Sequence, residues 1–160
     1  MTAVTIRPAV RDDLPGLRRV IDGVGLFPSD MLDGMVAPFL DGRAGTGEFW
    51  LTVDGDAGPI SVGYCAPERM TEGTWNMLLI AVDPVRQGAG VGAAMMAETE
   101  RLLAESGQRI LLVETSGLPE FERTRAFYRG LGYDEEARIR DFYQAGEDKV
   151  VFRKALGGGA

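Results

Sequence analysis

The spacing of hydrophobic residues changes from segment to segment, and this predicts a mixed set of helices and strands. Apolar side chains three and four positions apart indicate an amphipathic helix that starts at residues 12–15, with an Asp cap, and is ended by Gly23 and Gly25. Two short apolar runs, residues 49–53 and 60–64, are separated by an Asp-Gly-Asp turn and predict a hairpin. The unbroken apolar run at residues 77–82 is typical of a strand that is covered on both faces.

The second half of the chain alternates strands with helices. The strongest predicted helix covers residues 90–106, and a second buried-type strand follows at 109–114. A helix over residues 120–131 then ends at Gly132, and the apolar pairs near 142–143 and 150–152 predict a closing antiparallel pair.

The expected element order is therefore β-α-α-β-β-β-α-β-α-β-β, which is an α/β fold with a mixed sheet. The strand ending at residue 82, the helix 90–106 and the strand 109–114 form one right-handed parallel crossover at its centre. A chain of 160 residues is long enough for one domain with a proper core. We expect a single domain over residues 1–155 and a flexible tail over 156–160.

Composition excludes several classes of protein. The chain is 45% hydrophobic and 26% charged, which is typical of a folded domain, and its net charge is -7. An acidic surface disfavours nucleic acid and mildly favours cationic partners such as amines. No apolar run is long enough to cross a bilayer, and the first 20 residues lack the apolar core of a signal peptide. The expected compartment is the cytoplasm, with no membrane partner.

The counts of cysteine and histidine limit the chemistry. A single cysteine, Cys65, excludes a disulfide framework and a cysteine-rich zinc site. The chain has no histidine, which removes Ser-His and Cys-His nucleophilic catalysis and most transition-metal sites. We therefore expect no metal, and any general base must be Glu, Asp, Tyr, Lys or water.

A glycine-rich segment joins the buried strand to the strongest helix. Gly88, Gly90 and Gly92 allow the backbone to approach a ligand closely, because no Cβ is in the way. The helix that follows presents unpaired N–H groups and the positive end of its dipole, which together form a site for phosphate or pyrophosphate.

One interpretation of this segment is a dinucleotide site of an oxidoreductase that binds NAD. Gly88, Gly90 and Ala93 satisfy the loose G-x-G-x-x-[GA] pattern, and Glu114 ends the next strand where a ribose-binding acid belongs. However, an antiparallel sheet comes first, and only 68 residues follow Gly92. These are too few for the remaining units of such a domain and for a substrate domain.

The other interpretation rests on a more specific motif. Val82, Pro84, Gln87, Gly90 and Gly92 satisfy V-x-P-x-x-[RQ]-x-x-G-x-[GA], and the segment resembles motif A of the GNAT (GCN5-related N-acetyltransferase) superfamily. The resemblance extends to the opening residues 6–15, to Val62-Gly63-Tyr64 and to the segment Ala126-Phe127-Tyr128-Arg129-Gly130-Leu131-Gly132-Tyr133.

This resemblance implies a GNAT acyl-CoA N-acyltransferase fold and an N-acetyltransferase that moves the acetyl group of acetyl-CoA to a primary amine. Direct attack by the amine in a ternary complex is expected. The two central parallel strands splay apart, pantetheine lies along the first of them, and a backbone N–H near Ile80 polarises the thioester carbonyl, a contact typically worth about 3 kcal/mol. The implied cofactor-binding residues are Leu79, Ile80, Ala81, Val82, Gln87, Gly88, Ala89, Gly90, Val91, Gly92 and Phe127. Many members bind pantetheine with an asparagine at the position of Phe121, and Thr124 is the nearest polar candidate in this chain.

The resemblance also assigns the catalytic groups. Tyr128 matches the family tyrosine that protonates the departing CoA thiolate. In some members a glutamate at the position of Asn76 acts as the general base. The candidates for the base in this chain are Glu114, Glu72, Asp141 and water. Glu114 is best placed, near the point where the strands diverge. Arg125 is expected at the solvated surface.

The acceptor and the acyl-chain preference cannot be assigned from these residues. Small amines, aminoglycosides, amino acids, polyamines and peptide amines all stay open, as does a homodimer. A CoA-binding regulatory domain without catalysis is the remaining alternative.

Overall fold

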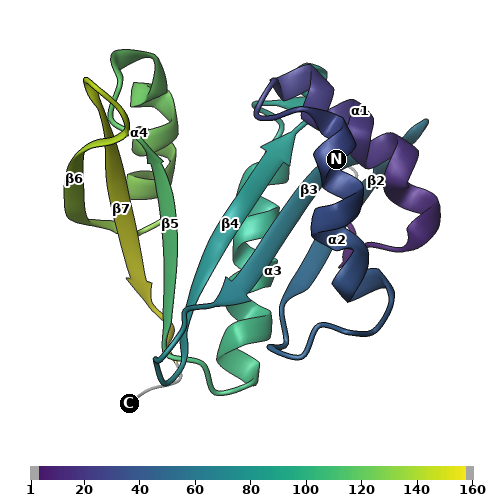
Figure 1. Ribbon diagram of the computed structural model, residues 1–160, viewed down its shortest axis with the longest axis horizontal. Helices are drawn as coiled ribbons and strands as arrows, with labels where there is room; N and C mark the ends of the chain where they lie inside the picture. Colours follow the sequence, from purple (N-terminus) through teal and green to yellow (C-terminus); the bar gives the residue numbers. More distant parts are fainter. Residues whose placement is uncertain (1–3, 158–160) are drawn as a thin grey trace. The chain divides into compact units, whose positions relative to one another are not determined.

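The computed structural model describes residues 4–157. Contacts divide the chain into two compact units, Met1–Pro67 with Leu78–Arg101 and Glu68–Met77 with Leu102–Ala160. The hydrogen-bonded strand order is β1 (Ile6–Pro8), β2 (Phe49–Gly55), β3 (Gly58–Pro67), β4 (Thr74–Val82), β5 (Ile110–Ser116), β7 (Glu147–Ala155) and β6 (Asp134–Gln144). Strand β4 has residues in both units. Helices and a mixed sheet confirm the expected α/β class (Figure 1).

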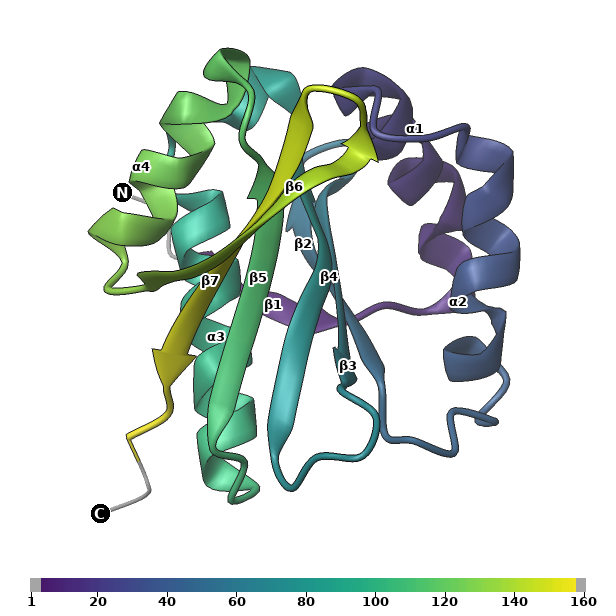
Figure 2. The same ribbon diagram turned by 60° about the vertical axis from the view of Figure 1, so that its left-hand side comes forward.

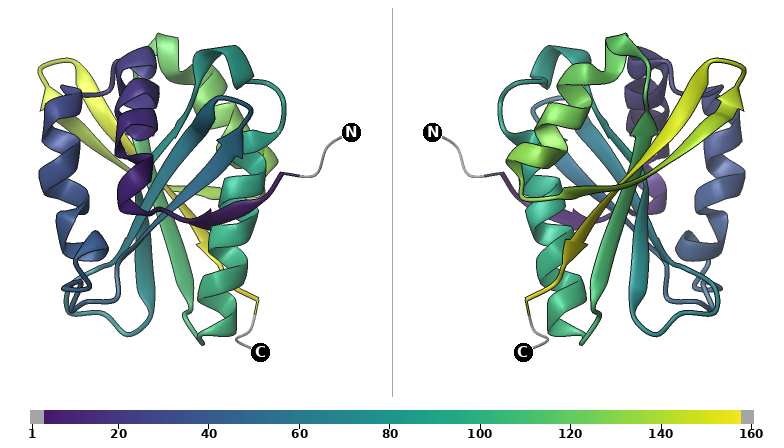
Figure 3. Two further views of the ribbon diagram at one scale, coloured as in Figure 1. Left: turned by 90° about the vertical axis from the view of Figure 1, so that its right-hand side faces the viewer. Right: turned by 90° about the vertical axis from the view of Figure 1, so that its left-hand side faces the viewer.

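The first unit is built from two antiparallel pairings, β1 with β2 and β2 with β3. Helices α1 and α2 cover one face of these strands, and α3 lies on the other face (Figure 3). Its elements are β1 Ile6–Pro8, η1 Arg11–Asp13, α1 Leu14–Val24, η2 Ser29–Met31, α2 Leu32–Leu40, β2 Phe49–Gly55, β3 Gly58–Pro67, the second half of β4 Thr74–Val82, η3 Pro84–Arg86 and most of α3 Val91–Glu105.

The core of this unit follows the hydrophobic pattern of α1. Leu17 and Ile21 are fully buried against Trp50 of β2, together with Leu32 from the following helix. The helix ends at Gly25, whose φ of 75° suits a residue without a Cβ and whose N–H donates to the carbonyl of Ile21 over 2.8 Å.

The second unit is organised around strand β5. Residues Thr74–Met77 of β4 pair with Ile110–Val113 in parallel, as the predicted crossover requires. Strand β5 pairs along its whole length with β7, and α4 lies beside β5 and the β6–β7 hairpin (Figure 2). Its further elements are β5 Ile110–Ser116, η4 Pro119–Phe121, α4 Glu122–Gly130, β6 Asp134–Gln144 and β7 Glu147–Ala155.

Two details differ from the sequence expectations. Strand β4 is not covered on both faces, since Leu78 is 52% exposed in the middle of its apolar run. The closing hairpin is longer than its apolar residues indicated. The pattern missed this length because all eleven residues of β6 are exposed and show no apolar alternation.

The domain boundaries stay a prediction. Leu156, at the start of the expected tail, is buried, and its N–H donates to the carbonyl of Arg109 over 2.8 Å. Residues 158–160 of that tail lie outside the described residues. No helix among residues 4–157 has the length and apolar character needed to cross a membrane.

Cys65, on β3, is buried with a free thiol. Burial raises the pKa of this thiol to about 12, because a buried thiolate is poorly solvated. The thiol is therefore a small apolar group of the core at neutral pH.

Asp13 does not cap α1 with its side chain, in contrast to the sequence expectation. Its carboxylate instead accepts the N–H of Val10 over 2.8 Å and binds the guanidinium of Arg7 through two bonds of 2.8 Å. Arg7, which lies in β1, also binds Asp54 of β2, so one arginine joins the residue before α1 to the sheet. Hydrogen bonds from Arg7 lower the pKa of Asp13 below its ordinary value.

We predict that Asp13→Asn lowers the free energy of unfolding by about 2 kcal/mol at pH 7, since a charged hydrogen-bond network loses its anion. The folded-state pKa of Asp13 lies below the unfolded value of about 3.9. Its stabilisation is thus present above that unfolded value and is lost as the pH falls through the lowered pKa. Urea unfolding at pH 7 and at successively lower pH should show that the difference in the free energy of unfolding between wild type and Asp13→Asn becomes smaller.

The matched control is Asp12→Asn, an exposed neighbour that should change stability by less than about 0.5 kcal/mol. If the difference in the free energy of unfolding between wild type and Asp13→Asn stayed constant with pH, the stabilising role of the Asp13 carboxylate would be contradicted.

Candidate active site

The glycine-rich loop between β4 and α3 has its own internal structure. The carboxylate of Asp83 accepts the N–H of Val85 over 3.1 Å and caps η3. The side-chain amide of Gln87 donates to the carbonyl of Val82 over 3.1 Å, which ties the loop back to the end of the strand. These bonds hold the path of the chain up to the glycines.

Two glycines then turn the chain into α3. Gly88 and Gly90 both have φ of 85°, a conformation that side chains rarely adopt, and a Cβ at either position would meet nothing within 4 Å. Within the described part of the chain, the N–H groups of Gly88 and Gly90 donate to no backbone or side-chain acceptor. The first turn of α3 adds the N–H groups of Val91, Gly92 and Ala93, which a helix leaves unpaired at its start.

This arrangement can bind an anion. Open space over two glycines, unpaired N–H groups and the positive end of a fifteen-residue helix all lie in one short segment. The loop therefore fits the pyrophosphate that the sequence predicted there.

The predicted pantetheine-binding residues occupy the second half of β4. Leu79 and Ala81 are buried, whereas Ile80 and Val82 are half-buried. The parallel ladder with β5 ends at Met77 and Val113, and β4 continues for five residues beyond it.

Tyr128 is placed by α4 in an aromatic cluster of the second unit. Its ring lies 5.3 Å from Phe127, 6.1 Å from Tyr133 and 5.6 Å from Phe152 between centroids. The residue is only 4% exposed, and its hydroxyl has no hydrogen-bond partner among the described residues. Burial raises the pKa of this hydroxyl above its ordinary value. Tyr128 thus holds an unused O–H donor that stays protonated at neutral pH.

Thr124 and Phe127 accompany this tyrosine. Both are half-buried on α4, with Thr124 one turn before Tyr128. The structure therefore groups these three predicted residues on one short helix.

Glu114 belongs to a polar cluster of the same unit. The amide Nδ2 of Asn76 donates to Glu114 over 3.2 Å and to Glu68 over 2.8 Å. The ammonium of Lys149 lies 3.4 Å from the Glu114 carboxylate and 3.9 Å above the ring of Phe142. Glu114 is also the first residue of β5 beyond the ladder with β4.

The other two base candidates lie in different surroundings. The carboxylate of Asp141 accepts the N–H of Gly146 over 2.8 Å and so closes the β6–β7 turn. Glu72 is exposed, and its carbonyl accepts from Arg109. Of the three candidates, only Glu114 contacts Asn76.

Three polar residues near these groups were missed or misjudged from the sequence. Glu68 and Lys149 complete the cluster around Glu114, and no local pattern marks them. Arg125 was expected at the solvated surface but is 5% exposed. Its helical spacing from Tyr128 was the signal, because residues three apart share a helix face.

Among the described residues, no group of three or more Cys, Asp or Glu side chains could hold a metal ion.

Comparison with known proteins shows the family to which the chain belongs. Residues 45–135 match the family model described as the acetyltransferase (GNAT) domain. A search of curated proteins gives no match.

Solved structures agree with the family model. A protein assigned to the GNAT acetyltransferase family from Desulfovibrio desulfuricans is 33% identical, with 97% of this chain and 100% of that chain covered and a TM-score of 0.89. The ribosomal-protein-S18-alanine N-acetyltransferase of Escherichia coli is 19% identical, with 96% and 94% covered and a TM-score of 0.76. A phosphinothricin acetyltransferase from Sinorhizobium meliloti, solved with acetyl-CoA, is 18% identical, with 99% and 91% covered and a TM-score of 0.78.

The chain therefore belongs to the GNAT family and is an acetyltransferase. This membership confirms the resemblance inferred from the residues of motif A. It also supports the GNAT interpretation of the glycine loop over that of an oxidoreductase that binds NAD.

We predict that the hydroxyl of Tyr128 does not ionise where an exposed tyrosine does. Wild type and Tyr128→Phe should have the same phenolate absorbance at 295 nm at pH 11 while both are folded, because burial holds the proton on Tyr128. The raised folded-state pKa also means that this group's stabilisation is complete below about pH 10 and is lost as the pH rises above it.

Unfolding both proteins in urea at the same pH supplies the control, since the wild type should then gain the absorbance of one additional phenolate. A difference of one phenolate between the folded proteins at pH 11 would show that Tyr128 is solvated.

Proposed function

We propose that this acetyltransferase moves the acetyl group of acetyl-CoA to a primary amine by direct attack in a ternary complex. The observation that carries the proposal is the glycine loop at the start of α3, where unpaired N–H groups and open space coincide. Neighbours on the same fold were solved with acetyl-CoA and with coenzyme A, which agrees with this choice of acyl donor.

The loop from Gln87 to Gly92 would hold the pyrophosphate of acetyl-CoA, mostly through backbone N–H groups. Helix dipoles and N–H donors favour anions at such a position. Along β4, the residues Leu79 to Val82 would hold pantetheine, and the N–H near Ile80 would polarise the thioester carbonyl. Such a donor strengthens its bond as the carbonyl oxygen gains charge.

Tyr128 would donate a proton to the leaving group. The acceptor nitrogen forms a bond to the thioester carbon, the C–S bond breaks, and the sulfur leaves with its electron pair. A protonated phenol without another partner can donate to this developing thiolate. Thr124 and Phe127 on the same helix would contact the cofactor.

Glu114 would accept the proton that the amine must lose. An alkylammonium has a pKa of about 10, so it holds its proton at neutral pH until a base removes it. Glu114 supports this role because its carboxylate lies beside Asn76, the position at which some family members carry a glutamate. Water is the alternative base.

The acceptor is an amine of unassigned identity. The Escherichia coli neighbour is named for a ribosomal-protein alanine and the Sinorhizobium neighbour for phosphinothricin, so one fold serves unrelated acceptors. A net charge of -7 favours a cationic acceptor. A screen of amines for release of free CoA thiol identifies the acceptor and tests the proposed reaction.

We predict that Gly90→Glu weakens acetyl-CoA binding by at least about 100-fold, because the new carboxylate meets the pyrophosphate at short range. Calorimetry with acetyl-CoA, CoA and NAD checks this result. The matched control is Gly107→Glu, where the glycine also has positive φ and open space but lies outside the loop. Equal losses in the two variants would trace the effect to backbone strain and would remove the loop from the site.

We also predict that Tyr128→Phe lowers kcat by about 100-fold while the Kd for acetyl-CoA changes less than about threefold. Glu114→Gln should lower kcat/KM for alkylamines but spare a neutral nucleophile such as hydroxylamine, whose nitrogen is already unprotonated before attack at pH 7.5. The control for Glu114 is Glu72→Gln, an exposed carboxylate. An unchanged kcat in Tyr128→Phe would contradict its role as proton donor.

A further inference from the structure

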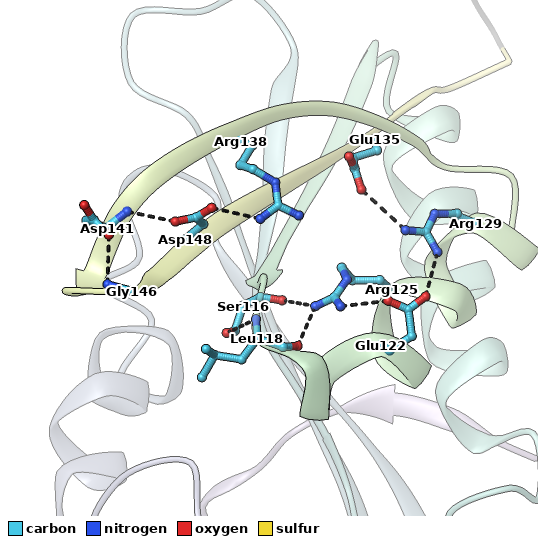
Figure 4. A network of polar contacts seen from close by, with 10 residues as sticks. All are labelled: Ser116, Leu118, Glu122, Arg125, Arg129, Glu135, Arg138, Asp141, Gly146 and Asp148. Atoms are coloured by element: carbon cyan, nitrogen blue, oxygen red, sulfur yellow. Dashed lines mark hydrogen bonds and ion pairs between the residues drawn. The ribbon is translucent and has the colours of Figure 1, made fainter.

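Arg125 is a buried cation on α4 with three hydrogen-bond partners. It is 5% exposed, and one guanidinium nitrogen donates to the carbonyl of Ser116 over 2.6 Å and to that of Leu118 over 2.9 Å. The other terminal nitrogen donates to the carboxylate of Glu122 over 2.8 Å. Figure 4 shows the guanidinium lying against the end of β5 and the start of α4.

These partners lie at the end of β5, in the connection that follows it and at the start of α4. Ser116 is the last residue of β5, Leu118 precedes η4, and Glu122 is the first residue of α4. The connection also has an internal bond, since the hydroxyl of Ser116 accepts the N–H of Leu118 over 3.1 Å. Arg125 therefore ties the end of the strand directly to the helix that follows it.

Helix α4 depends on such anchors because it is short. It has nine residues, and isolated helices below about 12 residues are marginal in water. Removing the guanidinium would take this donor from the carbonyl of Ser116, which costs free energy wherever water cannot reach that group. The carbonyl of Leu118 would keep the N–H of Phe121.

The anchor lies on the same helix face as Tyr128. The two residues are three positions apart, which places them on one face, and both are buried. By contrast, Arg129 is more exposed and binds the carboxylates of Glu122 and Glu135 at 3.6 and 3.4 Å, without any bond to the end of β5.

We propose that Arg125 is a positioning residue for Tyr128. By binding the carbonyls at the end of β5, Arg125 holds the register of α4 against the strand and so holds the tyrosine hydroxyl where the leaving sulfur departs. The inference rests on the proposed role of Tyr128 as proton donor. Arg125 itself transfers no proton and touches no substrate.

The test is a double-mutant cycle on kcat, with acetyl-CoA as donor and hydroxylamine or the best amine of a panel of alkylamines and polyamines as acceptor. Arg125→Lys keeps the charge but lacks the planar fork whose two terminal nitrogens reach the carbonyls and the carboxylate of Glu122. We expect kcat to fall about tenfold to 100-fold, with KM for acetyl-CoA within about threefold. In the Tyr128→Phe background the same substitution should change kcat less than about threefold, because the group it positions is gone.

Two further variants sharpen the result. Arg129→Lys is the matched control on the same helix and should leave kcat within about twofold. Glu122→Gln removes the exposed charge partner of Arg125 and leaves the arginine in place, so it serves if Arg125→Lys does not fold. We expect Glu122→Gln to lower kcat about threefold in the wild type and not in Tyr128→Phe.

The inference would be overturned if the kcat of the double variant fell by the product of the losses in Arg125→Lys and Tyr128→Phe alone. A folded Arg125→Lys with wild-type kcat would overturn it too. If Arg125→Lys does not fold, a Glu122→Gln loss that persists in Tyr128→Phe overturns it as well. Failure of the proposed function gives a different result, since the wild type would then release no CoA with any acceptor of the panel.

Discussion

The parallel ladder between β4 and β5 is the constraint on which the rest of the second unit depends. It joins only Thr74–Met77 to Ile110–Val113, and both strands continue past it. Asn76 lies inside the ladder and Glu114 is the first residue beyond it on β5, so the register alone brings these two side chains within hydrogen-bond reach. A shift of one residue would turn Glu114 to the opposite face of the sheet.

The same strands separate two chemical environments. Phe152 of β7 contacts Tyr128, whereas Lys149 of the same strand pairs with Glu114. Because these two β7 residues are an odd number of positions apart, they point to opposite faces. The hydroxyl of Tyr128 is therefore surrounded by aromatic rings, and the carboxylate of Glu114 by an amide and an ammonium.

Much of the fold could be predicted from the sequence, because periodicity and glycines report local structure. The apolar run at residues 77–82 and the glycines from Gly88 to Gly92 identified the central strand, the loop and the following helix. The charged contacts could not be predicted in this way. The burial of Arg125 depends on carbonyls seven and nine residues away. The carboxylate of Asp13 binds Arg7 and so does not cap α1. Such partners are chosen by the tertiary arrangement, which local pattern does not encode.

The buried thiol of Cys65 has a practical consequence for enzymology on this protein. It is the chain's one cysteine, and with a pKa of about 12 only on the order of 1 in 10,000 molecules carries a thiolate at pH 8. Aromatic disulfide reagents react with thiolates, so the native protein contributes almost no background colour. Every equivalent of chromophore released in such an assay then reports a molecule of free CoA, and acetyl transfer can be followed continuously without first blocking the enzyme.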